Sequence, residues 1–127
     1  MIENNMDKQT KIMENSRMMF EDSDIVGNPF FDTKNGFIAF DEIHKNDIEI
    51  LEVGLKKSGN LKKLVKELKK YCLQEKKYNI IIFIANKNNY VSKVISAFEK
   101  VFVSPPDSIV NYYTTDSIEN SHVFKVN

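Results

Sequence analysis

The sequence has a single cysteine, Cys72, and no long apolar run. One thiol excludes an intramolecular disulfide and a zinc site built from several cysteines, and it favours a reducing compartment. The longest apolar run, Ile80 to Ala85, is too short to cross a bilayer, and Met1 to Phe20 is too polar for a signal peptide. We therefore expect a cytoplasmic protein that has no membrane partner.

Arginine is scarce as well, since every basic side chain except Arg17 is a lysine. This disfavours base reading, which uses the forked guanidinium group. The net charge of zero hides a separation: residues 1–53 carry −7, residues 54–100 carry +9 and residues 101–127 carry −2. The basic middle block indicates either a polyanionic partner or a solvated helix face. Few aromatic residues lie among its lysines, so nucleic acid is the least favoured partner.

A chain of 127 residues in which 42% are hydrophobic is long enough for one domain with a core. In residues 1–35 the apolar residues are spaced too irregularly for a confident amphipathic helix. We predict an N-terminal arm there, irregular or forming a short helix, and a domain over residues 36–127. Turn-forming residues are dense up to Gly36, and we expect regular structure to start after them.

The next part of the chain alternates strands and helices. Phe37 to Ile43 and Ile48 to Leu55 read as strands joined by a four-residue turn, which predicts an antiparallel hairpin. From Leu61 to Cys72 apolar residues recur with helical spacing, and lysines fill the opposite face. This pattern predicts an amphipathic helix of about four turns.

Ile80 to Ala85 is continuously apolar, as expected for a strand at the centre of the sheet that is covered on both faces. A strand, a helix and a second strand in this order predict a right-handed crossover between parallel strands. A second helical stripe runs from Val91 to Phe102, and Ile109–Thr115 and Ser121–Val126 read as a closing strand pair. The predicted fold is α+β, a single mixed sheet flanked by helices in the order β-β-α-β-α-β-β.

The start of the helix at Leu61 is the most informative site. Asn60 is a suitable N-cap, and Ser58 and Gly59 supply a flexible turn before it. A helix N-terminus prefers acidic residues, yet Lys62 and Lys63 stand in this first turn. A bound anion would explain the lysines. The alternative is that the lysine-rich solvent face simply continues to the helix end.

The stretch from Lys56 to Leu64 follows the spacing of a known phosphate-binding signature: a basic residue or Gln, two residues, Gly, one residue, Gly or Ala, two residues and an apolar residue. An asparagine-containing loop and the helix end Phe98–Val103 follow. In these motifs and in element order, residues 37 to 126 resemble the GNAT superfamily of acyl-CoA N-acyltransferases.

The resemblance implies acetyl-CoA, or another phosphate-bearing ligand, as the cofactor, and direct attack of an amine on the thioester. Pantetheine would lie between the splayed ends of the two parallel strands, and the N–H groups of Gly59 to Lys62 would bind the pyrophosphate. Glu52 is the candidate base, its alternative role being that of a solvated strand residue, and Tyr113 or Tyr112 is the candidate acid. The candidate cofactor-binding residues are Val53, Leu55, Lys56, Ser58, Gly59, Asn60, Leu61, Lys62 and Asn89.

Two residues support a different hypothesis. Leu61 stands where the family has a small residue, and Phe98 stands where many members have the tyrosine that protonates the leaving thiolate. Short GNAT-like members occur among phage-encoded proteins, where the fold can serve virion assembly or host takeover. The alternative is therefore a catalytically inactive structural or interaction protein of the host cytoplasm or virion, with a protein partner or a second copy of itself.

No other residue carries a chemical signature. His44 and His122 lack carboxylates at metal-ligand spacing, so we expect surface histidines and no metal site. Cys72 lies on the apolar face of the first predicted helix of the domain. We expect it to be a small buried hydrophobic residue and not a nucleophile.

Overall fold

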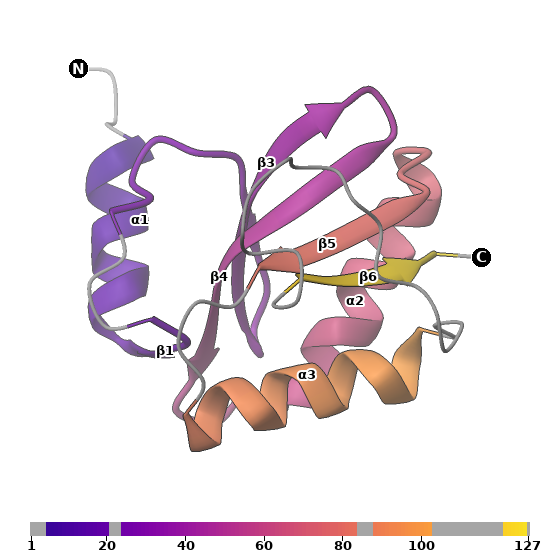
Figure 1. Ribbon diagram of the computed structural model, residues 1–127. Coiled ribbons are helices and arrows are strands. Elements are labelled where there is room, and N and C mark those ends of the chain that lie inside the picture. The colour runs from indigo at the N-terminus through magenta and orange to yellow at the C-terminus, as the bar shows by residue number, and fades with distance from the viewer. Residues whose placement is uncertain (1–4, 21–23, 84–87, 103–120, 127) are drawn as a thin grey trace.

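The computed structural model describes residues 5–20, 24–83, 88–102 and 121–126. Figure 1 shows the helices and strands in space. In chain order they are α1 (Asn5–Glu14), β1 (Ser16–Met18), β2 (Phe30–Asp32), β3 (Gly36–His44), β4 (Asp47–Lys56), α2 (Leu61–Gln74), β5 (Asn79–Phe83), α3 (Asn89–Val101) and β6 (Ser121–Lys125). Across these ranges every helix falls short of the length and apolarity that a membrane span requires.

The strands form one mixed sheet of six strands in the order β2-β3-β4-β5-β6, with β1 attached to β4 beside this path. The predicted hairpin is confirmed as β3 and β4, although its turn has only Lys45 and Asn46 between the strands. The parallel pairing and the connecting helix of the predicted crossover are confirmed as well, because β4 and β5 are parallel and α2 lies between them in the chain. The structure is thus α+β with one mixed sheet and flanking helices.

Three expectations need correction or remain open. Regular structure begins before Gly36, because α1, β1 and β2 precede that residue. The strand predicted at the sheet centre, β5, lies between β4 and the edge strand β6, and the central place belongs to β4. Of the closing pair, β6 is present and antiparallel to β5, whereas Ile109–Thr115 lies outside the described residues.

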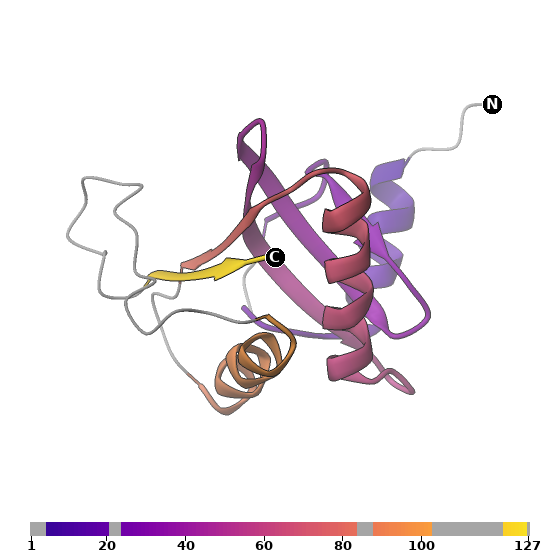
Figure 2. The same cartoon turned by 90° about the vertical axis from the view of Figure 1, so that its right-hand side faces the viewer.

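The helices divide between the two faces of the sheet. The buried stripes of α2 and α3 pack on one face, as Figure 2 shows from the side. Side chains such as Leu64, Leu68 and Phe98 fill this main core. On the other face Ile12 and Met13 of α1 pack against a smaller cluster around Phe37. The arm predicted from the sequence therefore contributes a helix to one layer and two strands to the sheet.

A β-bulge lies in the middle of β4. Ala39 pairs with Glu52 and Phe40 pairs with Ile50, so Leu51 is an additional residue in β4. The parallel pairing with β5 ends at the same level, where Ile50 lies opposite Ile82. Beyond the bulge β4 keeps β3 on one side and gains β1 on the other (Figure 1).

Gly54→Ala tests the close approach of β3 and β4. A Cβ atom at position 54 would lie 2.0 Å from Cε1 of Phe37, whose ring is fully buried. We expect urea unfolding to show a loss of about 1–3 kcal/mol, the usual cost of overpacking a core. Ser58→Ala in the exposed turn is the control and should stay within about 0.5 kcal/mol. If Gly54→Ala were as stable as wild type, the Phe37 ring would have moved to admit the methyl group without a loss of stability.

Candidate functional site

The edge of β4 beyond the bulge is the place where the predicted pantetheine contacts would lie. The carbonyl oxygen of Val53 accepts a hydrogen bond from Met19 N–H at 3.1 Å. Main-chain groups alternate in direction along a strand, so Leu55 faces the same side, where it lies opposite Arg17 of β1. The two residues predicted to bind pantetheine are therefore paired with the protein's own N-terminal segment.

Glu52, the predicted base, is fully buried. Its carboxylate accepts hydrogen bonds from the main-chain N–H groups of Met19, Phe20 and Val53, with Phe20 at 3.0 and 3.1 Å from its two oxygens and Val53 at 3.2 Å. The alternative interpretation of a solvated strand residue is wrong. The N–H dipoles offset part of the cost of burying a carboxylate. The side chain thus binds the segment that follows β1.

Tyr90 is a residue of this region that the sequence analysis missed. Its hydroxyl donates to the Val53 carbonyl at 3.4 Å, and the Arg17 guanidinium lies 4.6 Å from its ring centroid. Burial, followed by the charge of Glu52, raises the pKa of Tyr90 above its usual 10.0. The phenol therefore keeps its proton at neutral pH. The helical spacing of Tyr90 with Val94 and Phe98 was the signal that could have found it.

Asn35, which is only 6% exposed, occupies the inside of the bend before α2. Its Oδ1 accepts from Asn60 N–H at 3.1 Å, and its main-chain oxygen accepts from Lys56 N–H at 3.1 Å. Its Nδ2 donates to Glu67 of α2 at 2.7 Å. A Cβ atom on Gly59 would lie 1.8 Å from the Asn35 carbonyl oxygen. The glycine of the bend is therefore required by a contact inside the chain.

The N–H groups predicted to bind pyrophosphate divide into two pairs. Gly59 N–H donates to the Lys56 carbonyl at 2.9 Å, and Asn60 N–H is bound by Asn35. In the described part of the chain nothing accepts from the N–H groups of Leu61 and Lys62, the first two residues of α2. Asn60 is the N-cap, as predicted, and its Oδ1 accepts from Lys63 N–H at 2.9 Å.

The open start of α2 borders a hollow of about 340 Å³ between α2 and α3. It is lined by Asn60, Leu61, Lys62, Lys93, Ser96, Ala97 and Lys100. Three of these residues are lysines, and they come from two helices. Lys56 does not join them, because its ammonium group binds Asp32 Oδ1 at 2.7 Å and the Thr33 carbonyl at 2.6 Å.

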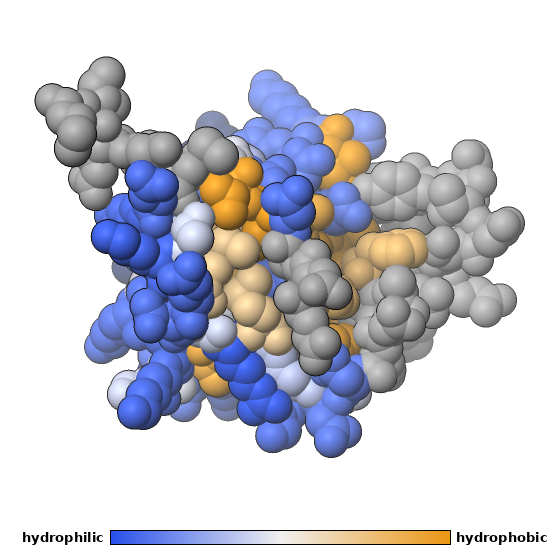
Figure 3. Space-filling model, turned by 90° about the vertical axis from the view of Figure 1, so that its left-hand side faces the viewer, coloured by the Kyte–Doolittle hydropathy of each residue, from blue (hydrophilic) through white to orange (hydrophobic). Residues whose placement is uncertain are grey.

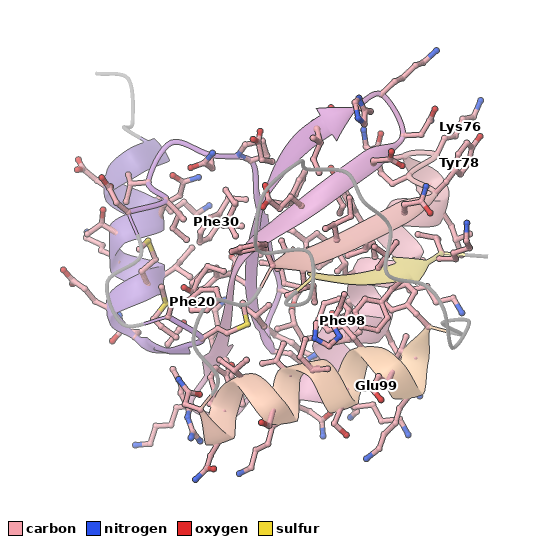
Figure 4. All side chains as sticks on the ribbon, in the orientation of Figure 1. Phe20, Phe30, Lys76, Tyr78, Phe98 and Glu99 are labelled. Carbon is pink, nitrogen blue, oxygen red and sulfur yellow. The ribbon has the colours of Figure 1, made fainter. Side chains whose placement is uncertain are left out.

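The other predicted site residues are scattered. Ser58 and Asn89 are exposed, and it is Asn88 that caps α3 by accepting from Val91 N–H at 2.8 Å. Figure 4 shows Phe98 on α3 directed toward the sheet, where its ring contacts those of Phe102 and Phe124 at centroid distances of 5.7 and 5.4 Å. Tyr112 and Tyr113 lie outside the described residues.

A second, larger groove of about 680 Å³ lies where α1 approaches β2. Figure 3 shows this side of the molecule, with apolar side chains next to the polar ones of the helix. Gln9 holds α1 to the loop before β2, since its Nε2 donates to the Asn28 carbonyl at 3.2 Å and its Oε1 accepts from Gly27 N–H at 2.8 Å. The groove is lined by Lys8, Gln9, Ile12, Gly27, Asn28, Pro29, Phe30 and Asp32, and no sequence motif marked it.

Comparison of the chain with protein-family models, with curated proteins and with solved structures gives no match. The resemblance to the GNAT superfamily therefore depends on the residues and the order of elements discussed above.

Gly59→Ala distinguishes a structural glycine from a ligand-binding one. If the glycine serves the contact with Asn35, the additional methyl group displaces the Asn35 carbonyl, and we expect a loss of about 1–3 kcal/mol in urea unfolding. If it serves only the approach of a ligand, the free protein should unfold as before. Ser58→Ala, one residue away and exposed, is again the matched control.

The Cys72 thiol should be inert in the folded protein. It is fully buried, and burial raises its pKa from 9.0 to about 12. We expect no alkylation by iodoacetamide at pH 8 and rapid alkylation in urea. The folded state favours the neutral thiol, so its contribution is intact below pH 9 and is lost as the pH rises toward 12.

The difference in stability between wild type and Cys72→Ala should accordingly shrink by about 2 kcal/mol between pH 8 and pH 10.5. A difference that stays constant over this range would contradict the raised pKa.

Proposed function

We propose that this chain is a catalytically inactive GNAT-like protein that acts through contacts with other proteins. The observation that carries this proposal is the pairing of β1 with β4. The Val53 carbonyl, which acyl transfer would need for pantetheine, is already bound by Met19 N–H. A ligand on this edge would have to displace β1 together with Met19, which follows β1 directly and is 1% exposed.

The chemistry of the neighbouring groups supports the same conclusion. A general base must come within hydrogen-bonding distance of the proton that it removes. Glu52 is fully buried and its oxygens are bound by main-chain N–H groups, so it has no access to an incoming amine. The phenyl ring of Phe98 has no proton to donate. The raised pKa of Tyr90 makes its phenol a weaker acid than an ordinary tyrosine.

The surface supports an interaction role. Positive charge gathers on one side of the sheet, because the exposed lysines of α2 and α3 lie there. A patch of one charge orients a partner of complementary charge and raises its association rate. We propose a protein partner or a second copy of the chain, in a structural role like that of short GNAT-like proteins encoded by phages, in the host cytoplasm or the virion.

One observation favours a second candidate function, acetyl-CoA-dependent N-acetyltransfer. Among the described residues nothing accepts from the N–H groups of Leu61 and Lys62, and these groups border a hollow with three lysines, which is suitable for phosphate. In this candidate, pyrophosphate binds at the start of α2 and β1 leaves β4 to admit pantetheine. The two functions make opposite predictions for the cofactor.

Titration with acetyl-CoA separates them. For the inactive protein we expect no calorimetric heat and no shift in melting temperature at millimolar acetyl-CoA at physiological salt. The acetyltransferase predicts a rise of several degrees, since binding to the folded state stabilises it. ADP is the control ligand: an equal rise with ADP would assign binding to the lysines and not to pantetheine.

Matched variants locate any binding that occurs. Lys93→Glu with Lys100→Glu changes the hollow, and Lys8→Glu with Lys11→Glu changes exposed lysines of α1. A shift with acetyl-CoA that only the first pair abolishes, and that ADP does not produce, would overturn the proposal of an inactive protein.

A further inference from the structure

The outer edge of β2 presents a row of main-chain groups. β2 is the first strand in the order of the sheet, and it pairs with β3 on one side. Thr33 N–H donates to the Gly36 carbonyl at 2.8 Å, so this position faces β3. Because main-chain groups alternate in direction along an antiparallel strand, those of Phe30 and Asp32 point away from β3. In the described part of the chain the N–H and C=O groups of these two residues have no hydrogen-bond partner.

Pro29 does not close this edge. Proline, which lacks an N–H group, commonly protects edge strands against the addition of a further strand. Here, however, the Pro29 carbonyl accepts from Phe40 N–H at 3.1 Å, so the missing N–H group belongs to the side that faces β3. Gln9 of α1 binds the main chain of Gly27 and Asn28, just before β2 begins. The outer row of β2 itself thus keeps its donors.

Hollows lie on both sides of this edge. The groove of about 680 Å³ lies on the α1 side, and a hollow of about 340 Å³ lies on the α2 side, lined by Phe31, Thr33, Glu67, Lys70, Tyr71 and Gln74. Phe30 packs with the cluster on the α1 side (Figure 4), whereas the ring of Phe31 lies 5.2 Å from that of Tyr71 in α2. Successive side chains of a strand point to opposite faces. A strand added beside β2 would therefore direct alternate side chains into the two hollows.

The charges available beside the edge are positive. Lys8 lines the groove on the α1 side and Lys70 lines the hollow on the α2 side, and neither forms an ion pair with a described residue. The two carboxylates of these hollows are already bound: Asp32 pairs with the Lys56 ammonium group at 2.7 Å, and Glu67 accepts hydrogen bonds from two polar side chains. The edge is therefore complementary to carboxylates. A second copy paired through β2 would bring the same lysines together, which is unfavourable.

We propose that the outer edge of β2 accepts an extended acidic segment of a partner protein as an additional strand of the sheet. The main chain of the segment pairs with Phe30 and Asp32. Its side chains enter the two hollows, where apolar ones contact Phe30 and Phe31 and carboxylates reach Lys8 and Lys70. This inference depends on the proposed interaction function, and it assigns the binding site and the chemistry of the partner.

A capped peptide of about eight residues, in which valine and glutamate alternate, is the probe, and the wild-type chain is the acceptor. Hydrogen exchange followed by nuclear magnetic resonance locates the binding. We expect the N–H groups of Phe30 and Asp32 to exchange rapidly in the free protein and at least about tenfold more slowly with the peptide bound, because they become hydrogen-bonded. Phe31 N–H, which faces β3, should change less.

Two control peptides separate main-chain pairing from charge. The same peptide with every main-chain nitrogen methylated keeps its carboxylates but has no N–H group to donate, and it should not bind. A peptide in which valine and lysine alternate should bind at least about tenfold more weakly than the probe, because its charges repel Lys8 and Lys70.

Matched variants of the chain test the position of the site. Lys8→Glu with Lys70→Glu reverses the charges beside β2 and should weaken binding of the probe at least about tenfold. Lys93→Glu with Lys100→Glu makes the same change of charge on α3 and should bind the probe as wild type does.

The proposal would be overturned if the wild-type chain did not bind the probe, if the methylated peptide bound equally well, or if the α3 variant alone lost binding. A dimer of the wild-type chain that protects Phe30 and Asp32 would assign the edge to a second copy and overturn the choice of an acidic partner. Acetyl-CoA is absent from these experiments, so their failure would leave the inactivity toward acetyl-CoA standing.

Discussion

The structure depends on how the second half of β4 is paired. The bulge at Leu51 and the end of the pairing with β5 leave Val53 to Lys56 with one open side. An unpaired main-chain group in a protein interior costs free energy comparable to a lost hydrogen bond. β1 satisfies these groups, and this explains why an N-terminal segment far away in sequence belongs to the middle of the sheet.

This pairing also gives Glu52 its role. A buried carboxylate is costly unless hydrogen bonds surround it, and here the donors are the main-chain N–H groups of Met19, Phe20 and Val53. Burial, and after it the negative charge of Glu52, raises the pKa of Tyr90, whose hydroxyl donates to the Val53 carbonyl. Residues 16–20, the Glu52 carboxylate and the Tyr90 phenol therefore form one connected group on the edge where a cofactor was expected.

In the bend before α2, too, main-chain groups are hydrogen-bonded by other residues of the same chain. Asn35 uses its side chain and its carbonyl to bind Asn60 and Lys56, and it reaches Glu67 on α2. The glycine and the lysine that resemble a phosphate-binding signature are thus used by the chain itself. In the part of the chain that the structure describes, the N–H groups of Leu61 and Lys62 keep no acceptor, and they lie next to lysines of α2 and α3.

The sequence by itself determined the elements with strong periodicity: the hairpin, the crossover from β4 to β5, and both helices of the main core, with Asn60 as a cap. These depend on local spacing and on contacts between neighbours in the chain. Only the tertiary structure decided what lies against β4, because β1 is a three-residue strand without a periodic signal and its partner is more than thirty residues away. The burial of Glu52 and the role of Asn35 come from such distant pairings, which no local pattern encodes.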